Sequence, residues 1–204
     1  MKVLLINGSP KAERCTFTAL SEVAKTLEAE GIETEIVHIG NQAIRGCIDC
    51  RACKKNGKCV FNDIVNEVAP KFAECDGLVV GTPVYYASAN GNLISFLDRL
   101  FFSTPFDKSM KVALPLYPHA AAAALPPLTN LTNTSPLSHA GCLQPVLEQR
   151  TRFTPEDVRK DEEGLQTMRT LGKNMAFLIK SIALGKEKYG LPEREPQILT
   201  NFID

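Results

Sequence analysis

The sequence predicts an α/β protein built on an open, doubly wound sheet of parallel strands, with helices on both faces. Two observations support this prediction. Short apolar runs that end in glycine or proline alternate with segments whose apolar residues recur at helical spacing. The chain has 204 residues, 44% of them hydrophobic, which suffices for one domain with a complete core. Strands that alternate with helices are joined by crossovers, and such crossovers make neighbouring strands parallel.

Three segments are predicted to be strands. Residues 2–7, "KVLLIN", form an apolar run that stops at Gly8, as is typical of a buried parallel strand that meets a loop. The second strand is predicted over residues 33–39, "ETEIVHI", and the third within residues 75–86, "CDGLVVGTPVYY". His38 ends the second strand, and we interpret it as a hydrogen-bonded structural residue. Cys75 precedes the third strand and is assigned to the core.

Amphipathic helices are predicted after the first and third strands and at the end of the domain. The first helix starts at Thr16 and stops at Gly31, and residues 91–101, "GNLISFLDRLF", form another. Thr154, which precedes Pro155, predicts the start of a long final helix. The apolar face of this helix comprises Leu165, Met168, Leu171, Met175 and Leu178.

Composition and charge exclude several classes of function. Lys and Arg total 23 and Asp and Glu total 23, so we expect no basic surface for nucleic acid. We expect a cytoplasmic protein without membrane insertion, because no apolar stretch can span a bilayer and the N-terminus lacks a signal-peptide pattern. Seven cysteines in a reducing compartment indicate metal or redox chemistry. The predicted domain covers residues 1–185, in which 113–152 are anomalous, and a tail covers 186–204.

The loop "NGSPKAERCT", residues 7–16, joins the first strand to the first helix. Free backbone N–H groups and the helix dipole favour an anion there. Ser9 and Thr16 can add hydroxyl donors, and Lys11 or Arg14 a cation. An ordinary turn is the alternative interpretation. A ligand is favoured because the loop leaves the carboxyl end of a central strand, where open α/β sheets bind ligands.

A second loop follows the third strand at the same edge of the sheet. Pro83 fixes the backbone there, and Tyr85 and Tyr86 offer flat rings and hydroxyls. The alternative is a strand end with two packed tyrosines. Together the two loops can hold one ligand that has both a phosphate and a planar ring.

The run "GCIDCRACKKNGKC", residues 46–59, contains a C-x2-C-x2-C-x5-C array. Spacing this tight can bring four thiolates around one centre. Zinc fits less well, because its structural sites usually consist of two separated Cys-x2-Cys pairs. The remaining alternative is that these cysteines pack as small apolar residues or form a redox pair. The cysteines concerned are Cys47, Cys50, Cys53 and Cys59.

These motifs resemble the NAD(P)H-dependent FMN reductase family of flavodoxin-like proteins. The resemblance rests on "INGSPK" with Thr16, on "DGLVVGTPVYY" with "GNLISFLDRL", and on the cysteine run, and it covers residues 1–112 and 154–180. The cysteine run is similar to that of the iron–sulfur flavoproteins within the family. The resemblance implies the strand order 2-1-3-4-5, FMN as cofactor, NAD(P)H as reductant and a homodimer or homotetramer.

The resemblance also implies the site residues. The FMN phosphate would contact Ser9, Lys11, Cys15 and Thr16. The isoalloxazine ring would contact Pro83, Val84, Tyr85 and Tyr86. A [4Fe–4S] cluster would be held by Cys47, Cys50, Cys53 and Cys59. Lys11 stands where the family usually has Arg, and Cys15 where it often has Asn. No acid–base residue is expected to be catalytic, because the cofactor performs the chemistry.

The expected function is an NAD(P)H-dependent FMN oxidoreductase that passes electrons from reduced flavin, via a [4Fe–4S] cluster, to a small-molecule or protein acceptor. Two alternatives stay open at this point. One is a quinone or azo-compound reductase on the same fold. The other is a non-catalytic electron carrier or redox-sensing module that uses the cysteines.

The segment after Val112 does not fit the resemblance. The family implies a fourth strand, an Arg-Arg-Gly-Gly loop, a helix, a fifth strand and a tryptophan-containing loop there. Residues 119–130, "HAAAAALPPLTN", show neither helical nor strand spacing, and the chain has no Trp.

A shifted reading frame supplies the missing pattern. Legal codons for the residues from Val112 onward permit "GAAVVSARRGG" when each new codon takes the third base of one printed codon and the first two bases of the next, and the same shift permits "FDQLNKYFTI" over residues 127–137. A second shift from His139 permits "MPVASSQYWNSVHG", after which the printed frame resumes at Phe153. We therefore interpret residues 113–152 as an out-of-frame translation, a hypothesis that DNA sequencing or an intact mass tests.

Overall fold

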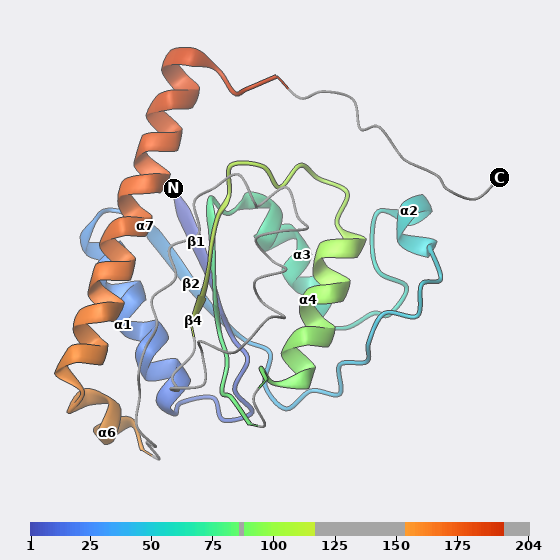
Figure 1. Cartoon of the computed structure of the whole chain (residues 1–204). Helices are drawn as coiled ribbons and strands as arrows, with labels where there is room; N and C mark the ends of the chain where they lie inside the picture. Colours follow the sequence, from blue (N-terminus) through green and yellow to red (C-terminus); the bar gives the residue numbers. More distant parts are fainter. Residues whose placement is uncertain (86–87, 117–153, 194–204) are drawn as a thin grey trace.

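The structure, a computed structural model, describes residues 1–85, 88–116 and 154–193 (Figure 1). Its described residues form a four-stranded parallel sheet in the order β2-β1-β3-β4. The strands are β1 (Lys2–Asn7), β2 (Glu33–His38), β3 (Gly77–Gly81) and β4 (Val112–Leu116). This arrangement confirms the predicted fold class. The predicted fifth strand falls outside the described residues.

Helices cover both faces of the sheet, with α1 and α7 on one face and α3 and α4 on the other (Figure 1). They are α1 (Cys15–Ala29), α2 (Ala52–Asn56), α3 (Ile64–Glu74), α4 (Gly91–Ser103), α6 (Pro155–Arg159) and α7 (Glu162–Tyr189). The sequence analysis missed α2 and α3. A signal for α3 was present, because Asp63 caps it by accepting a hydrogen bond from the Val65 amide.

Strand β4 corrects one expectation about the anomalous segment. The sequence analysis found no strand after Val112, but residues 112–116 pair with β3 in parallel register. Val112, Leu114 and Leu116 alternate along β4 and are buried, so the printed residues satisfy the period of a strand. The expectation that no fourth strand follows Val112 was therefore wrong. The remainder of the proposed out-of-frame segment lies outside the described residues.

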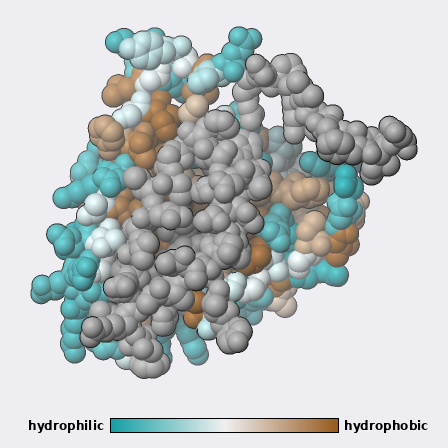
Figure 2. Space-filling view, viewed as in Figure 1, coloured by the Kyte–Doolittle hydropathy of each residue, from teal (hydrophilic) through white to brown (hydrophobic). Residues whose placement is uncertain are grey.

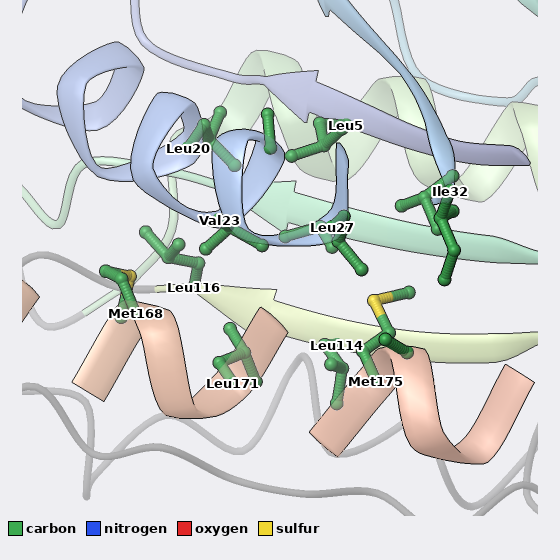
Figure 3. Packing of buried hydrophobic residues seen from close by; sticks show 14 of the residues in the cluster. Leu5, Leu20, Val23, Leu27, Ile32, Leu114, Leu116, Met168, Leu171 and Met175 are labelled. Atoms are coloured by element: carbon green, nitrogen blue, oxygen red, sulfur yellow. The ribbon is translucent and has the colours of Figure 1, made fainter. Parts of the chain in front are cut away.

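The core has two layers because successive strand residues point to opposite faces. Val3 and Leu5 of β1 join the layer beneath α1 and α7, whereas Leu4 and Ile6 join the layer beneath α3 and α4. Figure 3 shows the first layer, in which Leu5 from the sheet and the side chains of α1 and α7 fill the space between the elements. The labelled residues of the two helices are Leu20, Val23, Leu27, Met168, Leu171 and Met175.

The predicted final helix is two helices. Thr154 and Asp157 form a capping box at the start of α6, which confirms Thr154 as an N-cap. The chain then turns, and Asp161 caps α7 by accepting a hydrogen bond from the Gly164 amide. Helix α7 continues through residues 186–189, which the sequence analysis had assigned to the tail.

Helix α7 is amphipathic and rises past the end of the sheet (Figure 1). Its buried side comprises Met168, Leu171, Met175 and Ile179, among others. Figure 2 shows hydrophilic side chains along the lower left edge of the molecule, and hydrophobic ones above them along the upper part of α7. None of the described helices, α7 included, has an apolar stretch long enough to cross a membrane.

The close approach of α1 and α7 predicts the effect of a small substitution. A Cβ atom at Gly172 of α7 would lie 2.8 Å from the Thr26 Cβ of α1, closer than real contacts allow. Thr26 is β-branched and its hydroxyl bonds the Glu22 carbonyl, so it cannot easily move. We expect Gly172→Ala to lower the free energy of unfolding by about 1–3 kcal/mol in urea denaturation.

Gly185→Ala is the matched control in the same helix. A Cβ at Gly185 would meet no atom within 4 Å, so this change should raise the free energy of unfolding by about 0.5–1 kcal/mol. Equal effects of the two substitutions would contradict the described packing of α1 on α7.

Burial of Cys75 predicts an unreactive thiol. This residue is 1% exposed at the end of α3, and burial raises the pKa of its thiol to about 11. At pH 8 only about one thiol in a thousand would be the reactive thiolate. In metal-free native protein, iodoacetamide should label the exposed Cys47 and Cys50 but label Cys75 only after unfolding, as mapped by mass spectrometry. Labelling of all three at similar rates would contradict the prediction.

Candidate flavin and cysteine sites

Two loops meet at the carboxyl edge of the sheet, one after β1 and one after β3. The Gly8 amide donates to the Gly81 carbonyl at 2.8 Å. The Asn90 side-chain amide donates to the Gly8 carbonyl, also at 2.8 Å. A Cβ at Gly8 would lie 2.9 Å from Leu93 Cδ2, so only glycine permits this approach of the first loop to α4. The structure thus brings together the two loops that the sequence predicted to share one ligand.

The first loop is held in shape by its own side chains. Asn7 donates through Nδ2 to the Ala12 carbonyl at 2.9 Å and accepts the Ser9 amide at 3.1 Å. The Ser9 hydroxyl accepts the Lys11 amide at 3.2 Å, which leaves its own proton available to a ligand. His38 Nε2 lies 2.7 Å from the Ser9 carbonyl, which confirms His38 as a hydrogen-bonded structural residue.

The N-terminus of helix α1, which is the positive end of its dipole, faces this loop. Its N-cap residue, Arg14, provides no side-chain cap, and its first turn has no acidic residue. Helices α3, α4, α6 and α7 are capped by the side chains of Asp63, Asn90, Thr154 and Asp161, whereas the short helix α2 also has no side-chain cap. The first-turn amides of α1 are therefore suited to cap an anion.

The predicted phosphate residues occupy different positions around α1. Thr16 and Ser9 are buried, whereas Lys11 is exposed and reaches into solvent. The Cys15 thiol donates to the Thr154 carbonyl at 3.5 Å, which ties α1 to α6. The cysteine side chain thus has a structural partner, while its amide belongs to the first turn of the helix.

The loop after β3 turns back on itself. Val84 forms an antiparallel bridge with Ala89, and the Tyr85 amide donates to the Ser88 carbonyl at 3.3 Å. The Tyr85 side chain is 64% exposed, so a planar group can stack against it. Pro83 and Val84 are half-buried at the base of the loop, and the predicted contact Tyr86 lies outside the described residues.

The cysteine segment, residues 42–59, runs along the outer side of α4 from the start of that helix to its end. Asn92, near the start of α4, donates to the Gln42 carbonyl at 2.9 Å. The four cysteines line one pocket, together with Phe102 and Ser103 from the last turn of α4. Cys47 and Cys50 are exposed, Cys53 is buried in α2, and Cys59 is half-buried before α3. The structure therefore places all four predicted cluster ligands around one pocket.

Cys59 is the most firmly held of these ligands. Its backbone amide and carbonyl both bond the side chain of Asn66 at 3.0 Å. Its sulfur accepts two hydrogen bonds from Arg99, from Nε at 3.3 Å and from Nη2 at 3.2 Å. Arg99 also forms a two-pronged ion pair with Asp63, at 2.7 and 2.8 Å.

The charged side chain of Arg99 is buried in the protein interior. Its side chain is 0% exposed. Burial opposes the charge, but the hydrogen bonds with Asp63 and Cys59 outweigh burial and raise the pKa of the guanidinium above its ordinary value. The pocket wall therefore holds a fixed cation that contacts a cysteine sulfur.

Four cysteines around one pocket are the donor set that a [4Fe–4S] cluster uses. Among the described residues, no three Cys, His, Asp or Glu side chains stand close enough to hold one metal ion. A [4Fe–4S] cluster binds each thiolate through a different iron, so its ligands stand further apart than those of one ion. Ser103 lines the same pocket, and within the described chain its hydroxyl is buried without a hydrogen-bond partner. A group that accepts a hydrogen bond would satisfy it.

Sequence reasoning missed Asn90, Asp63 and Arg99 as residues of these sites. Asn90 and Asp63 each directly precede a helix, a signal of N-caps that the sequence contains. Arg99 lies in the predicted helix over residues 91–101, but only the packed segment over residues 45–63 reveals its burial.

The two sites lie at opposite ends of α4. Asn90 caps the helix beside the flavin loops, and Phe102 lines the cysteine pocket. A helix rises about 1.5 Å per residue, so these residues stand about 18 Å apart along the axis.

Known relatives of this chain include iron–sulfur flavoproteins. A relative described as an iron–sulfur flavoprotein, from Methanocaldococcus jannaschii, is 29% identical over 200 residues, which cover 89% of this chain and 99% of the relative. An iron–sulfur flavoprotein of Archaeoglobus fulgidus is 38% identical over 99 residues, which cover 48% of each chain.

Solved structures share the fold. An NAD(P)H:quinone oxidoreductase from Methanothermobacter marburgensis superposes with a TM-score of 0.62 at 14% identity, over 86% of this chain and 96% of that one. A flavodoxin from the domain Archaea superposes with a TM-score of 0.53 at 15% identity, over 88% of this chain and 99% of that one.

The family profile described as NADPH-dependent FMN reductase matches residues 1–133, which is well over half of the chain. The match confirms the enzyme class expected from the sequence, an NAD(P)H-dependent flavin oxidoreductase with FMN as its cofactor. This chain belongs to the NADPH-dependent FMN reductase family.

Proposed function

We propose that this flavin oxidoreductase passes electrons from reduced FMN to an acceptor through a [4Fe–4S] cluster in the cysteine pocket. The observation that carries the proposal is that the four cysteines line one pocket whose wall includes the buried cation Arg99. The relatives from Methanocaldococcus and Archaeoglobus, which are described as iron–sulfur flavoproteins, support it. The proposed ligands are Cys47, Cys50, Cys53 and Cys59.

We further propose that the two loops at the carboxyl edge hold FMN. The first-turn amides of α1, with the hydroxyls of Ser9 and Thr16, would bind the phosphate, and Lys11 would add a cation from solvent. Cys15 would contribute its amide. The ring would lie against the loop after β3, on Pro83, Val84 and Tyr85, with Tyr86 completing the predicted set.

Bound FMN would accept a hydride from NAD(P)H, and a bound cluster would pass single electrons onward to a small-molecule or protein acceptor. The residues of the chain contribute position and electrostatics. Asn90 holds the phosphate loop against β3, and α4 connects that loop to the cysteine pocket. No side chain is required to move a proton in this scheme.

We also propose that the chain forms a homodimer or homotetramer. Phe177 and Leu184 support self-association, since they are 70% and 66% exposed. Residues seven apart lie on the same face of a helix, so the two form one apolar strip on α7.

Anaerobic reconstitution tests the cluster. After incubation with Fe²⁺ and sulfide and removal of excess reagent, we expect about four iron atoms per chain and broad visible absorption that bleaches with dithionite. Cys53→Ser and Cys59→Ser should lose most of this iron while they retain FMN, because the pocket lies at the far end of α4 from the flavin loops.

Cys75→Ala is the matched control, since it removes a thiol from the core rather than from the pocket and should retain the iron. An iron-free wild-type protein that still reduces quinones or azo compounds with NAD(P)H would support the simple reductase instead. A protein that holds a cluster but does not oxidise NAD(P)H would support the non-catalytic carrier.

The contact of Asn90 with the phosphate loop predicts its effect on FMN affinity. Ser at this position still caps α4 but cannot reach the Gly8 carbonyl, which accepts the Asn90 amide at 2.8 Å. A lost buried hydrogen bond costs about 1–2 kcal/mol, so we expect Asn90→Ser to weaken FMN binding by about 5- to 30-fold in fluorescence titrations.

Riboflavin, which lacks the phosphate, provides the control ligand. If Asn90 acts on the phosphate loop, the variant should bind riboflavin almost as the wild type does. An equal loss for FMN and riboflavin would assign Asn90 to the ring or to general stability.

A further inference from the structure

We propose that Arg99 is a positioning residue that holds the Cys59 sulfur and raises the reduction potential of a cluster bound in the cysteine pocket. This inference rests on the proposed function. It concerns residues that the resemblance did not point to, since Arg99 and Asp63 lie outside the predicted ligand set.

The guanidinium of Arg99 uses each of its donor atoms. Nε and Nη2 donate to the Cys59 sulfur at 3.3 and 3.2 Å. Nη1 and Nη2 donate to the two carboxylate oxygens of Asp63, and Nη1 also reaches the Arg45 carbonyl at 3.4 Å. Phe61 covers the guanidinium, with its ring centroid 4.9 Å from the Arg99 Cζ. These contacts fix the orientation of the guanidinium, with one edge directed at the Cys59 sulfur.

Cys59 is held in place by more hydrogen bonds than the other cysteines of the pocket. Cys47 and Cys50 lie exposed in a segment without helix or strand. The Cys53 thiol donates a long hydrogen bond, at 3.9 Å, to the Phe102 carbonyl. Cys59 is fixed through its backbone by Asn66 and through its sulfur by Arg99. Cys59 is therefore the most firmly held of the four proposed ligands.

A hydrogen bond from a buried cation has a direct electrochemical effect. Reduction adds one negative charge to a cluster and its thiolates, and N–H donors to the sulfur stabilise that charge. Because Arg99 is withheld from solvent, its field on the sulfur is weakly screened. Asp63 opposes this field in part, while it also fixes the orientation of the donors.

Two substitutions with opposite expected shifts test the proposal. In Arg99→Lys the charge remains, but a single ammonium cannot replace the fork that bonds both Asp63 and Cys59. We expect its cluster potential to fall by at least 59 mV, a tenfold change in the one-electron equilibrium. Asp63→Asn keeps a good cap for α3 and removes the opposing charge, so its potential should rise. Potentials would be measured on reconstituted full-length protein by redox titration followed by electron paramagnetic resonance.

Arg45→Gln is the matched control. Arg45 stacks on the same Phe61 ring, 4.8 Å from its centroid, but it is exposed and contacts the network through its backbone carbonyl. Its removal should change the one-electron equilibrium less than threefold. Circular dichroism and FMN content verify that each variant is folded.

The outcomes separate this inference from the proposed function. A wild-type protein that takes up no iron would refute the cluster itself. A folded Arg99→Lys protein with normal iron and an unchanged potential would overturn the role of Arg99, as would an Asp63→Asn potential that falls. Folded Arg99→Lys protein with normal FMN but little iron would support the holding of Cys59, provided that Arg45→Gln retains its iron.

Discussion

Both candidate sites depend on the burial of helix α4 between the sheet and the cysteine segment. Leu93, Phe96 and Leu100 are fully buried against the strands, so the helix cannot rotate or slide without opening the core. Its N-cap, Asn90, then holds the loop after β1, and its last turn forms a wall of the cysteine pocket. Packing thus fixes the geometry of two sites that the chain forms from distant segments.

The buried pair of Arg99 and Asp63 shows how a charge is tolerated on that helix. Removal of an arginine from water is costly unless its donors are satisfied, and here Asp63, Cys59 and the Arg45 carbonyl accept them. A hydrophobic residue would fill the same volume without that requirement. The arginine instead donates two hydrogen bonds to the Cys59 sulfur, which supports the proposed positioning role.

The N-terminus of α1, unlike those of most other helices here, has no side-chain cap. Helices α3, α4, α6 and α7 are closed by their own cap residues, but the N-cap of α1 provides none. A phosphate at this position would supply the missing cap, so FMN would complete the helix as well as provide the chemistry. Hydrogen bonds from the side chains of Asn7 and His38 fix the shape of this loop.

The sequence by itself determined the fold class and much of the order of its strands and helices. Strands β1 to β3, helices α1 and α4, the Thr154 cap and the cysteine array follow from periodicity and spacing, because those signals are local. Local signals failed at β4, whose short run of alternating residues merges into an unpatterned segment, and at α3.

Only the tertiary structure decided which distant groups meet. The bond from Asn90 to Gly8, the clamp of Asn66 on Cys59 and the fork of Arg99 on the same sulfur join residues from different elements. No spacing along the chain encodes such contacts, since they arise when the sheet and α4 bury their apolar faces together. The sequence therefore predicted candidate residues for the two sites, and the packing of α4 determined which other residues hold these candidates in place.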